Sequence, residues 1–191
     1  MARPRNFDPD KVLDLARDVF WQKGFQGTSL DDVTAATGLA KPSLYAAFGD
    51  KNTLFLKVLD RYHGRIVSHA EKVINEGSSA REAIERWLAA FIPRCSGAKG
   101  SRGCLSVNAS TDGVAEQPAM RARIEAFNRK LEHLLRNRLR ADRAQFGAGF
   151  DPDAAAHTIM AIYLGLMVLA KDRPSAASVR ATLDQIMRLL V

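Results

Sequence analysis

Few side chains in this sequence have the spacing that catalysis or metal binding requires. The four histidines, His63, His69, His133 and His157, are scattered along the chain and form no metal-ligand pattern. The sequence also lacks a nucleophile elbow, a phosphate-binding loop and a cysteine–histidine pair. It therefore predicts a protein that is not an enzyme, with no catalytic residues, no metal and no cofactor.

The two cysteines have the clearest potential for chemistry, although two are too few for a disulfide framework. The run Arg102-Gly103-Cys104-Leu105 places a thiol beside a cation and near a predicted helix start, and both features favour a reactive thiolate. Cys95 is a resolving partner if the loop 97–103 lets the two Cα atoms approach within about 7 Å. The alternative is an inert Cys104 that packs beside Leu105 and Val107.

A second candidate for function is a pair of short amphipathic segments near the N-terminus. Ser29–Thr37 and Lys41–Phe48 each predict a short helix, and Gly38-Leu39-Ala40 predicts a tight turn between them. This is the sequence pattern of a helix-turn-helix. In the second helix Leu44 and Phe48 face inward. Three side chains face outward, where the N-terminal residues of a helix can reach base edges in a major groove of DNA: Lys41, Ser43 and Tyr45.

The rest of the chain is predicted to be helical as well, because apolar residues recur three and four positions apart and strand signals are nearly absent. Asp8-Pro9 begins a first helix that ends at Gly24, and Asp50 begins a long helix that runs to about Ile74. We expect an all-α, two-domain fold of nine helices. The five helices after the long one are expected at residues 80–92, 105–110, 120–146, 153–172 and 176–190.

Composition indicates an ordinary globular protein, because 47% of the 191 residues are hydrophobic and 26% are charged. The net charge of +7 favours an anionic partner without selecting nucleic acid over a membrane surface. Residues 1–50 carry six basic and seven acidic side chains, whereas Arg121–Arg143 carries eight basic and three acidic ones. One alternative is therefore a non-specific nucleic-acid binder that uses this basic segment; the other is that its charges form a solvated outer face.

An apolar run, Ala154–Ala170, is long enough to raise the question of a membrane span. Its 17 residues lie at the lower limit for spanning, and polar His157 and Thr158 interrupt it, so we expect a buried helix and no membrane partner. The charged residues Arg3, Arg5, Asp8 and Asp10 interrupt the N-terminus and argue against a secretory signal. The sequence predicts a cytoplasmic protein with reduced thiols.

The helix-turn-helix segment Thr28-Ser29-Leu30-Asp31-Asp32-Val33-Thr34-Ala35-Ala36-Thr37-Gly38-Leu39-Ala40-Lys41-Pro42-Ser43-Leu44-Tyr45-Ala46-Ala47-Phe48-Gly49-Asp50-Lys51 resembles the DNA-binding signature of the tetracycline-repressor family. Val19-Phe20, Lys23-Gly24-Phe25 and Leu54-Phe55 match the same pattern, so the resemblance covers about residues 8–60. Beyond them only the helical layout and the total length match. The resemblance implies a dimeric repressor that binds a double-stranded DNA operator and is released by a small-molecule effector.

The same resemblance implies three parts: a helix-turn-helix DNA-binding domain at residues 1–50, a connecting helix at 51–74, and an effector-binding and dimerisation domain at 75–191. An activator remains an alternative, because the sign of regulation depends on where the operator lies. Some members of the family have a similar Gly-Cys-Leu segment and sense electrophiles or oxidants through its cysteine. This resemblance implies a thiol-based switch at Cys104 as an alternative to a bound effector.

Family roles carry over to seven residues of the motif. Thr28 would bond a phosphate with help from the amide dipoles at a helix start, and Tyr45 and Lys51 would contact further phosphates. The residues that open the two helices would lie at the DNA: Ser29, Lys41, Pro42 and Ser43. Arg3 and Arg5 would form an arm that reaches DNA or is disordered.

One departure from the family pattern concerns base specificity. Ala46 and Ala47 stand where the family often has an aromatic or polar residue followed by histidine. Alanine cannot hydrogen-bond to DNA, so only apolar contact with a thymine methyl is open to these two positions. The departure leaves the operator sequence undefined without affecting the prediction of DNA binding.

The C-terminal part carries no readable ligand motif. Its last two helices carry apolar residues around much of their circumference, which predicts pairing with a second copy in a four-helix bundle. An apolar or aromatic small molecule is the default effector. The candidate effector-binding residues, each of which could equally be ordinary core, are Trp87, Phe91, Cys104, Asn108, Phe127, Tyr163 and Met167.

Overall fold

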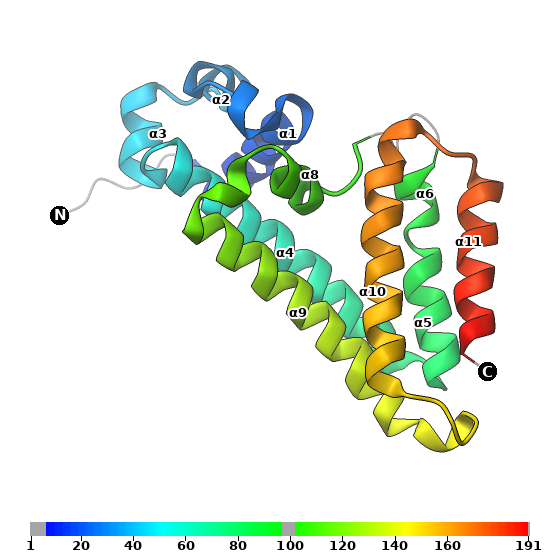
Figure 1. Cartoon of the computed structure of the whole chain (residues 1–191). Helices are drawn as coiled ribbons and strands as arrows, with labels where there is room; N and C mark the ends of the chain where they lie inside the picture. The colour runs from blue at the N-terminus through cyan, green and yellow to red at the C-terminus, as the bar shows by residue number, and fades with distance from the viewer. Residues whose placement is uncertain (1–6, 97–101, 191) are drawn as a thin grey trace. The chain divides into compact units, whose positions relative to one another are not determined.

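The computed structural model of the chain describes residues 7–96 and 102–190, and within these residues it contains helices and no strand. The all-α prediction is therefore confirmed. Figure 1 shows the order of the elements along the chain. Their bounds are α1 Pro9–Gly27, α2 Leu30–Thr37, α3 Lys41–Phe48, α4 Lys51–Glu76, α5 Ala80–Ala89, α6 Ile92–Cys95, α8 Leu105–Thr111, η1 Val114–Glu116, α9 Pro118–Ala141, η2 Arg143–Gln145, α10 Pro152–Leu169, η3 Ala170–Asp172 and α11 Ala176–Leu189.

Two helices are shorter than the sequence pattern indicated. The helix expected at residues 80–92 ends at Ala89, and α6 follows with Pro93 in its first turn. Proline cannot donate a backbone hydrogen bond, and its ring would clash with the carbonyl of residue 89 if the helix continued. The helix expected to run to Phe146 ends at Ala141, and a single 3-10 turn follows it.

The described residues form two compact units. The N-terminal unit comprises the described residues up to Gly64 together with Asn108–Arg123, and the C-terminal unit comprises Arg65–Val107 with the described residues from Ile124 onward. The sequence placed its boundaries after residues 50 and 74. The compact units instead divide the long helix α4 at Gly64, and the short segment after Val107 belongs to the N-terminal unit.

Local signals explain why the first three helices begin and end where they do. The Asp8 carboxylate accepts a hydrogen bond from Asp10 N at 2.9 Å, and Pro9 occupies the first helical position of α1. Ser29 and Asp32 form a capping box at the start of α2. Gly38 ends α2 in the left-handed conformation with φ +71°, which a residue with a Cβ rarely adopts.

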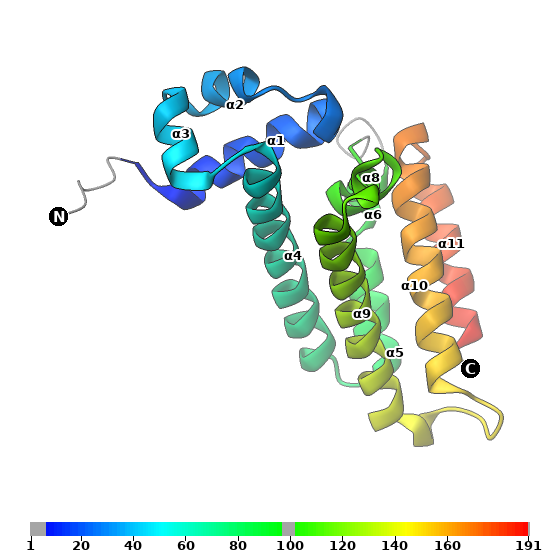
Figure 2. The ribbon, with the colours of Figure 1, turned by 60° about the vertical axis from the view of Figure 1, so that its left-hand side comes forward.

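The N-terminal unit is held by aromatic packing between α1 and the first turns of α4. Figure 2 shows α1, α2 and α3 gathered at that end of α4. The ring of Phe55 lies 4.8 Å from that of Phe20 and 5.0 Å from that of Phe25, centroid to centroid. Val33 and Leu44 are fully buried and anchor the two short helices to this core. Helices of this length are unstable alone, so tertiary packing holds them.

In the C-terminal unit α5, α6, α10 and α11 pack side by side (Figure 1). The prediction that the last two helices carry apolar residues around much of their circumference is wrong for α11. That helix is amphipathic, with a buried apolar face and an exposed polar face. Its buried side chains include Val179, Leu183 and Ile186, whereas Arg180, Asp184 and Arg188 are exposed.

Helix α10 does carry apolar residues on more than its inner face. Among the described residues, Pro152–Asp172 is the one helical stretch long and apolar enough to cross a membrane, and 39% of its apolar 18-residue window is buried inside the fold. Val168 and Leu169 are 49% and 53% exposed. The helix therefore packs one side on its neighbours and leaves an apolar strip uncovered.

Candidate functional site

The recognition-type helix α3 presents its polar side chains to solvent as the sequence pattern predicted. Lys41, Pro42 and Ser43 are exposed, and Tyr45 is 49% exposed. Leu44 lies on the opposite, fully buried side. Because α3 contains no acidic residue, its outer face offers a cation, hydroxyl groups and an aromatic ring with no repulsive charge of its own.

Lys57 on α4 supports the far end of α3, a contact that sequence reasoning missed. Its Nζ donates to the carbonyl of Ala47 at 3.3 Å and lies 5.6 Å from the centre of the Phe48 ring. A cation at this position satisfies one of the free carbonyls at a helix C-terminus and complements the helix dipole. No local pattern could indicate it, because a lysine on the next helix has many possible neighbours.

An ion pair engages Lys41 in the free protein. Its Nζ lies 2.6 Å from the carboxylate of Asp31 on α2, and both side chains are at least half exposed. The hydrogen bond to Asp31 raises the pKa of Lys41, so the side chain is charged at neutral pH. Pairs this exposed contribute little to stability. A DNA phosphate can therefore compete for Lys41 at small cost.

Thr28 does not present its hydroxyl to solvent. The residue is 2% exposed, and its Oγ1 donates to the carbonyl of Gly24 at 2.6 Å. In this conformation the Thr28 hydroxyl already donates its proton to a backbone carbonyl, so it cannot donate to a phosphate. The side chain instead stabilises the end of α1. The phosphate role remains a prediction that would require this hydrogen bond to break.

Ser29 is exposed, and both its hydroxyl and its amide are engaged with the carboxylate of Asp32. A hydrogen bond from Lys23, followed by those from the Ser29 amide and hydroxyl, lowers the pKa of Asp32 to about 2. The start of α2 is therefore a fixed, charged cap. Arg3 and Arg5, the predicted arm, lie outside the described residues.

Lys51 is the first residue of α4 and belongs to the same compact unit as α3. Its Nζ is 4.5 Å from the centre of the Phe25 ring and 3.5 Å from the carbonyl oxygen of Gln26. The two contacts hold the ammonium group against the turn between α1 and α2. Lys51 is partly exposed, which leaves it able to meet a phosphate.

The acidic residues of α1 are paired with cations of the same unit. Arg61 contacts the Asp14 carboxylate through Nε and Nη2, both at 3.1 Å, and its Nη1 lies 2.7 Å from Asp10. Arg17 pairs with Asp14 and Asp18. These ion pairs offset the negative charge of α1.

In the C-terminal unit three of the candidate effector residues form one buried aromatic cluster. Trp87 and Phe91 lie 5.1 Å apart, and Tyr163 lies 5.3 Å and 4.8 Å from them, centroid to centroid. All three are at most 3% exposed. The indole nitrogen of Trp87 is buried and has no hydrogen-bond partner. An unsatisfied buried donor costs free energy and is a place where a ligand acceptor would be favoured.

Both cysteines adjoin this cluster. Cys104 is 2% exposed, immediately precedes α8, and shares a side-chain hydrogen bond with Tyr163. Burial raises the pKa of Tyr163 well above its ordinary value, and burial raises the pKa of the Cys95 thiol to about 11. Cys95 is therefore a neutral thiol at physiological pH, and Tyr163 is a neutral phenol.

The remaining effector candidates do not all belong to the same compact unit. Met167 lies one helical turn after Tyr163 on α10 and is buried, as is Phe127 on α9. Asn108 belongs to the N-terminal unit, whereas the other six candidates belong to the C-terminal unit. The structure thus brings together the aromatic cluster and Cys104 within one unit.

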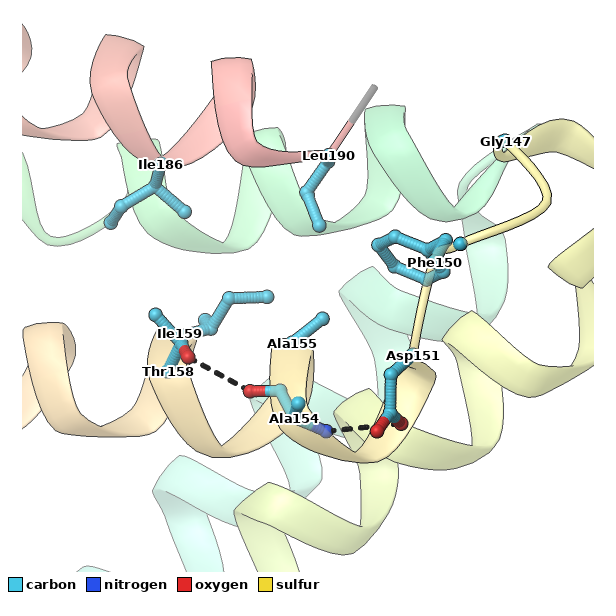
Figure 3. Close-up of a pocket in the computed structure, with 10 residues that line it drawn as sticks. Gly147, Phe150, Asp151, Ala154, Ala155, Thr158, Ile159, Ile186 and Leu190 are labelled. Carbon is cyan, nitrogen blue, oxygen red and sulfur yellow. Dashed lines mark hydrogen bonds between the residues drawn. The ribbon is translucent and has the colours of Figure 1, made fainter.

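A cavity of about 580 Å³ opens elsewhere in the C-terminal unit, and no sequence pattern indicated it. It lies between the start of α10, the end of α11 and the loop 147–151 (Figure 3). Ile159 and Ile186 form apolar walls, whereas the Thr158 hydroxyl and the Asp151 carboxylate already have hydrogen-bond partners within α10. None of the candidate effector residues lines this cavity.

Two family models match the chain. "Bacterial regulatory proteins, tetR family" matches residues 12–58, and "Tetracyclin repressor-like, C-terminal domain" matches residues 80–186. The first match covers the helix-turn-helix, and the second covers most of the C-terminal unit.

Curated relatives and solved structures agree with these matches. The chain is 41% identical over 112 residues to the HTH-type transcriptional repressor ComR and 36% identical over 104 residues to the HTH-type transcriptional repressor BdcR, both of Escherichia coli K12. These matches cover 58% and 54% of this chain, and 53% of each relative, so the chain spans about half of their length.

A structure of the TetR family transcriptional regulator CifR, a cysteine mutant complexed with 26-bp double-strand operator DNA, is 36% identical. The match has a TM-score of 0.87 and covers 97% of this chain and 98% of that chain. The similarity therefore extends through both compact units and is not limited to the helix-turn-helix.

Proposed function

This chain belongs to the tetR family of bacterial regulatory proteins, and from that premise we propose that it is a cytoplasmic transcriptional repressor that binds a double-stranded DNA operator through α3. The observation that carries the proposal is the outer face of α3. Lys41, Ser43 and Tyr45 are exposed there while Leu44 fixes the helix from behind. A helix held in this way can enter a major groove with its N-terminal residues at the base edges.

The proposed repressor acts as a homodimer. The uncovered apolar strip of α10, with Val168 and Leu169 about half exposed, supports pairing with a second copy. A two-fold dimer would place two copies of α3 about 35 Å apart, one turn of DNA, on a palindromic operator. The CifR structure contains operator DNA, which supports the same mode for this chain.

Operator binding is tested on DNA fragments from the protein's own genomic neighbourhood with excess competitor DNA. Tyr45→Ala and Lys51→Ala each remove a proposed phosphate contact and should weaken binding about tenfold. Arg129→Ala is the matched control, because Arg129 is 70% exposed within the basic segment of α9. If only Arg129→Ala loses binding, the protein is a non-specific nucleic-acid binder that uses the basic segment of α9. If Tyr45→Ala and Lys51→Ala both bind like the wild type, the interface on α3 is refuted.

For the effector, we propose a small aromatic or apolar molecule with a hydrogen-bond acceptor that enters the cluster of Trp87, Phe91 and Tyr163. The buried indole N–H of Trp87, which has no partner, supports this choice. The cluster is closely packed, so the ligand must open it. Only a ligand that binds better to the form with low operator affinity can release DNA.

The effector site is tested by screening aromatic carbonyl compounds for release of the operator complex. Trp87→Phe keeps the ring packing and removes the donor, so it should weaken the response to an active compound about tenfold. Phe150→Ala alters the separate cavity of Figure 3 and is the matched control. A response that depends on Phe150 and not on Trp87 would move the effector site to that cavity.

A second candidate trigger is oxidation of Cys104, which shares a hydrogen bond with Tyr163 and interacts electrostatically with Cys95. Hydrogen peroxide would transfer one oxygen to the Cys104 sulfur, giving a sulfenic acid and water. The Cys95 thiol would then displace that hydroxyl group as water and form a disulfide. Peroxide should release the operator from the wild type and not from Cys104→Ser. An undiminished response of Cys104→Ser would exclude this trigger.

A further inference from the structure

Helix α1 is broken near its end, and the break creates a need for a hydrogen-bond acceptor. Gly24 has φ +73° and ψ 168°, outside the helical region, and a further helical turn follows it up to Gly27. A helix that starts anew leaves its first backbone amides without carbonyl partners in the preceding turn. The amides concerned here are those of Phe25 and Gln26.

Asp112, which directly follows α8, supplies that acceptor. Its Oδ2 accepts from Phe25 N at 2.9 Å and from Gln26 N at 3.4 Å, although it is 87 residues from Phe25 in the sequence. It acts as an N-cap donated by another part of the chain. The contact also explains the glycine: a Cβ at position 24 would lie 2.8 Å from the same oxygen.

The turn that Asp112 caps is the one on which the proposed DNA contacts rest. The carbonyl of Gln26 accepts from Lys51 Nζ at 3.5 Å, and the ring of Phe25 lies beneath the same ammonium group. Thr28 fastens the other end of the turn, since its amide donates to the carbonyl of Phe25 at 3.3 Å. The position of Lys51 and the start of α2 therefore depend on a carboxylate that is itself remote from α3 in the sequence.

We propose that Asp112 is a positioning residue for operator binding: by capping the turn 24–28 it holds Lys51 and the start of α2 where they meet the DNA backbone. The inference rests on the proposed function of α3 and Lys51. It also gives the segment after α8 a regulatory role. Because α8 starts directly after Cys104 and ends directly before Asp112, a displacement of α8 by an effector would withdraw the cap. The phosphate contacts would then lose their support.

The test is a double-mutant cycle on operator affinity at one fixed salt concentration. Asp112→Ala should weaken operator binding about tenfold, although Asp112 is not proposed to touch DNA. Combined with Lys51→Ala it should cause a smaller loss than it causes in the wild type, because part of its effect passes through Lys51. Combined with Tyr45→Ala, which acts at a separate phosphate, the two losses should multiply. Asp112→Asn keeps one acceptor oxygen and should retain most of the affinity.

Asp151→Ala is the matched control for a purely structural effect. Asp151 also caps two amides, those of Asp153 and Ala154 at 2.9 Å and 3.3 Å, but it lies at the start of α10 in the C-terminal unit. It should lower the melting temperature as much as Asp112→Ala and leave operator affinity unchanged. Equal loss of affinity in the two variants would overturn the inference.

The remaining outcomes separate this inference from the proposed function. If Lys51→Ala and Tyr45→Ala weaken binding while Asp112→Ala binds like the wild type, the interface stands and the role of Asp112 is refuted. The role is also refuted if the losses from Asp112→Ala and Lys51→Ala multiply. If neither Lys51→Ala nor Tyr45→Ala weakens binding, the proposed interface fails, and the inference fails with it.

Discussion

The two compact units differ in how far their candidate functional side chains are exposed to solvent. The N-terminal unit buries only the apolar side of α3 and exposes Lys41 and Tyr45, whereas the C-terminal unit encloses Trp87, Tyr163 and Cys104 almost completely. A DNA groove is a large polar partner that must be met at the surface. A small effector gains affinity by being enclosed. A surface site for DNA can therefore be recognised in the amino-acid sequence, whereas an enclosed effector site has the same residue types as an ordinary core.

Both units combine local helix caps with contacts between distant segments. Ser29 caps α2 in the N-terminal unit, and Asp151 caps α10 in the C-terminal unit. In the C-terminal unit Ala80 N also donates to Asp142, and Arg138 donates to the carbonyl of Gly77. The units differ in the exposure of their candidate functional side chains, so we expect them to respond differently to the same type of substitution.

The largest loss of stability is expected when a cavity is made in the core of the N-terminal unit. Phe20→Ala removes a fully buried ring that packs on Phe55 and should cost about 3–5 kcal/mol of unfolding free energy. The N-terminal unit should then unfold first, leaving the helices of the C-terminal unit intact. Thermal denaturation followed by circular dichroism should show two separate transitions. A single transition that removes all helicity at once would mean that the two units fold as one.

A smaller effect is expected from acidification, through His63 of the N-terminal unit. Burial, followed by the charge of Arg123, lowers the pKa of His63 to about 4, against an ordinary 6.5. Above pH 6.5 both the folded and the unfolded states are neutral at this site, and stability is fully present. As the pH falls from 6.5 towards 4, only the unfolded state takes up the proton, and stability is lost by about 1.4 kcal/mol per pH unit.

Urea denaturation at pH 7.0 and pH 5.0 measures this loss. The wild type should lose about 2 kcal/mol more between these two pH values than His63→Gln, in which the titrating group is absent. Tyr163, the buried titratable group of the C-terminal unit, has a raised pKa and stays neutral throughout this range. An equal pH dependence of wild type and variant would show that His63 is protonated in the folded state.

The smallest effect compares one helix cap in each unit. Ser29 accepts from Asp32 N at 3.1 Å at the start of α2, and Ser79 accepts from Glu82 N at 3.2 Å at the start of α5. Replacing either with alanine should cost about 1 kcal/mol of unfolding free energy. Only Ser29→Ala should also weaken operator binding, measured by fluorescence anisotropy. If Ser29→Ala and Ser79→Ala weaken operator binding equally, the cap of α2 has no special role in binding the operator.

Local spacing was sufficient for the N-terminal helices. The capping box at Ser29, the left-handed Gly38 and the alternation of Leu44 inside with Tyr45 outside all depend on residues within one or two turns of each other. Such interactions are encoded by neighbours in the chain, so the sequence predicts them directly. Apolar periodicity continues past residue 89 to Ile92, although Pro93 prevents one continuous helix there, so periodicity predicts too long a helix.

The helical class, the helix-turn-helix and the outward face of α3 can thus be predicted from the amino-acid sequence. The folded structure was needed to show that Thr28 turns inward, that Lys57 and Asp112 cap helices to which they do not belong, and that Cys104 meets Tyr163. The contacts of Lys57, Asp112 and Cys104 join residues that are far apart along the chain or on different helices. A hydrogen bond between residues 87 positions apart depends on the packing of every element between them, and no local periodicity records it.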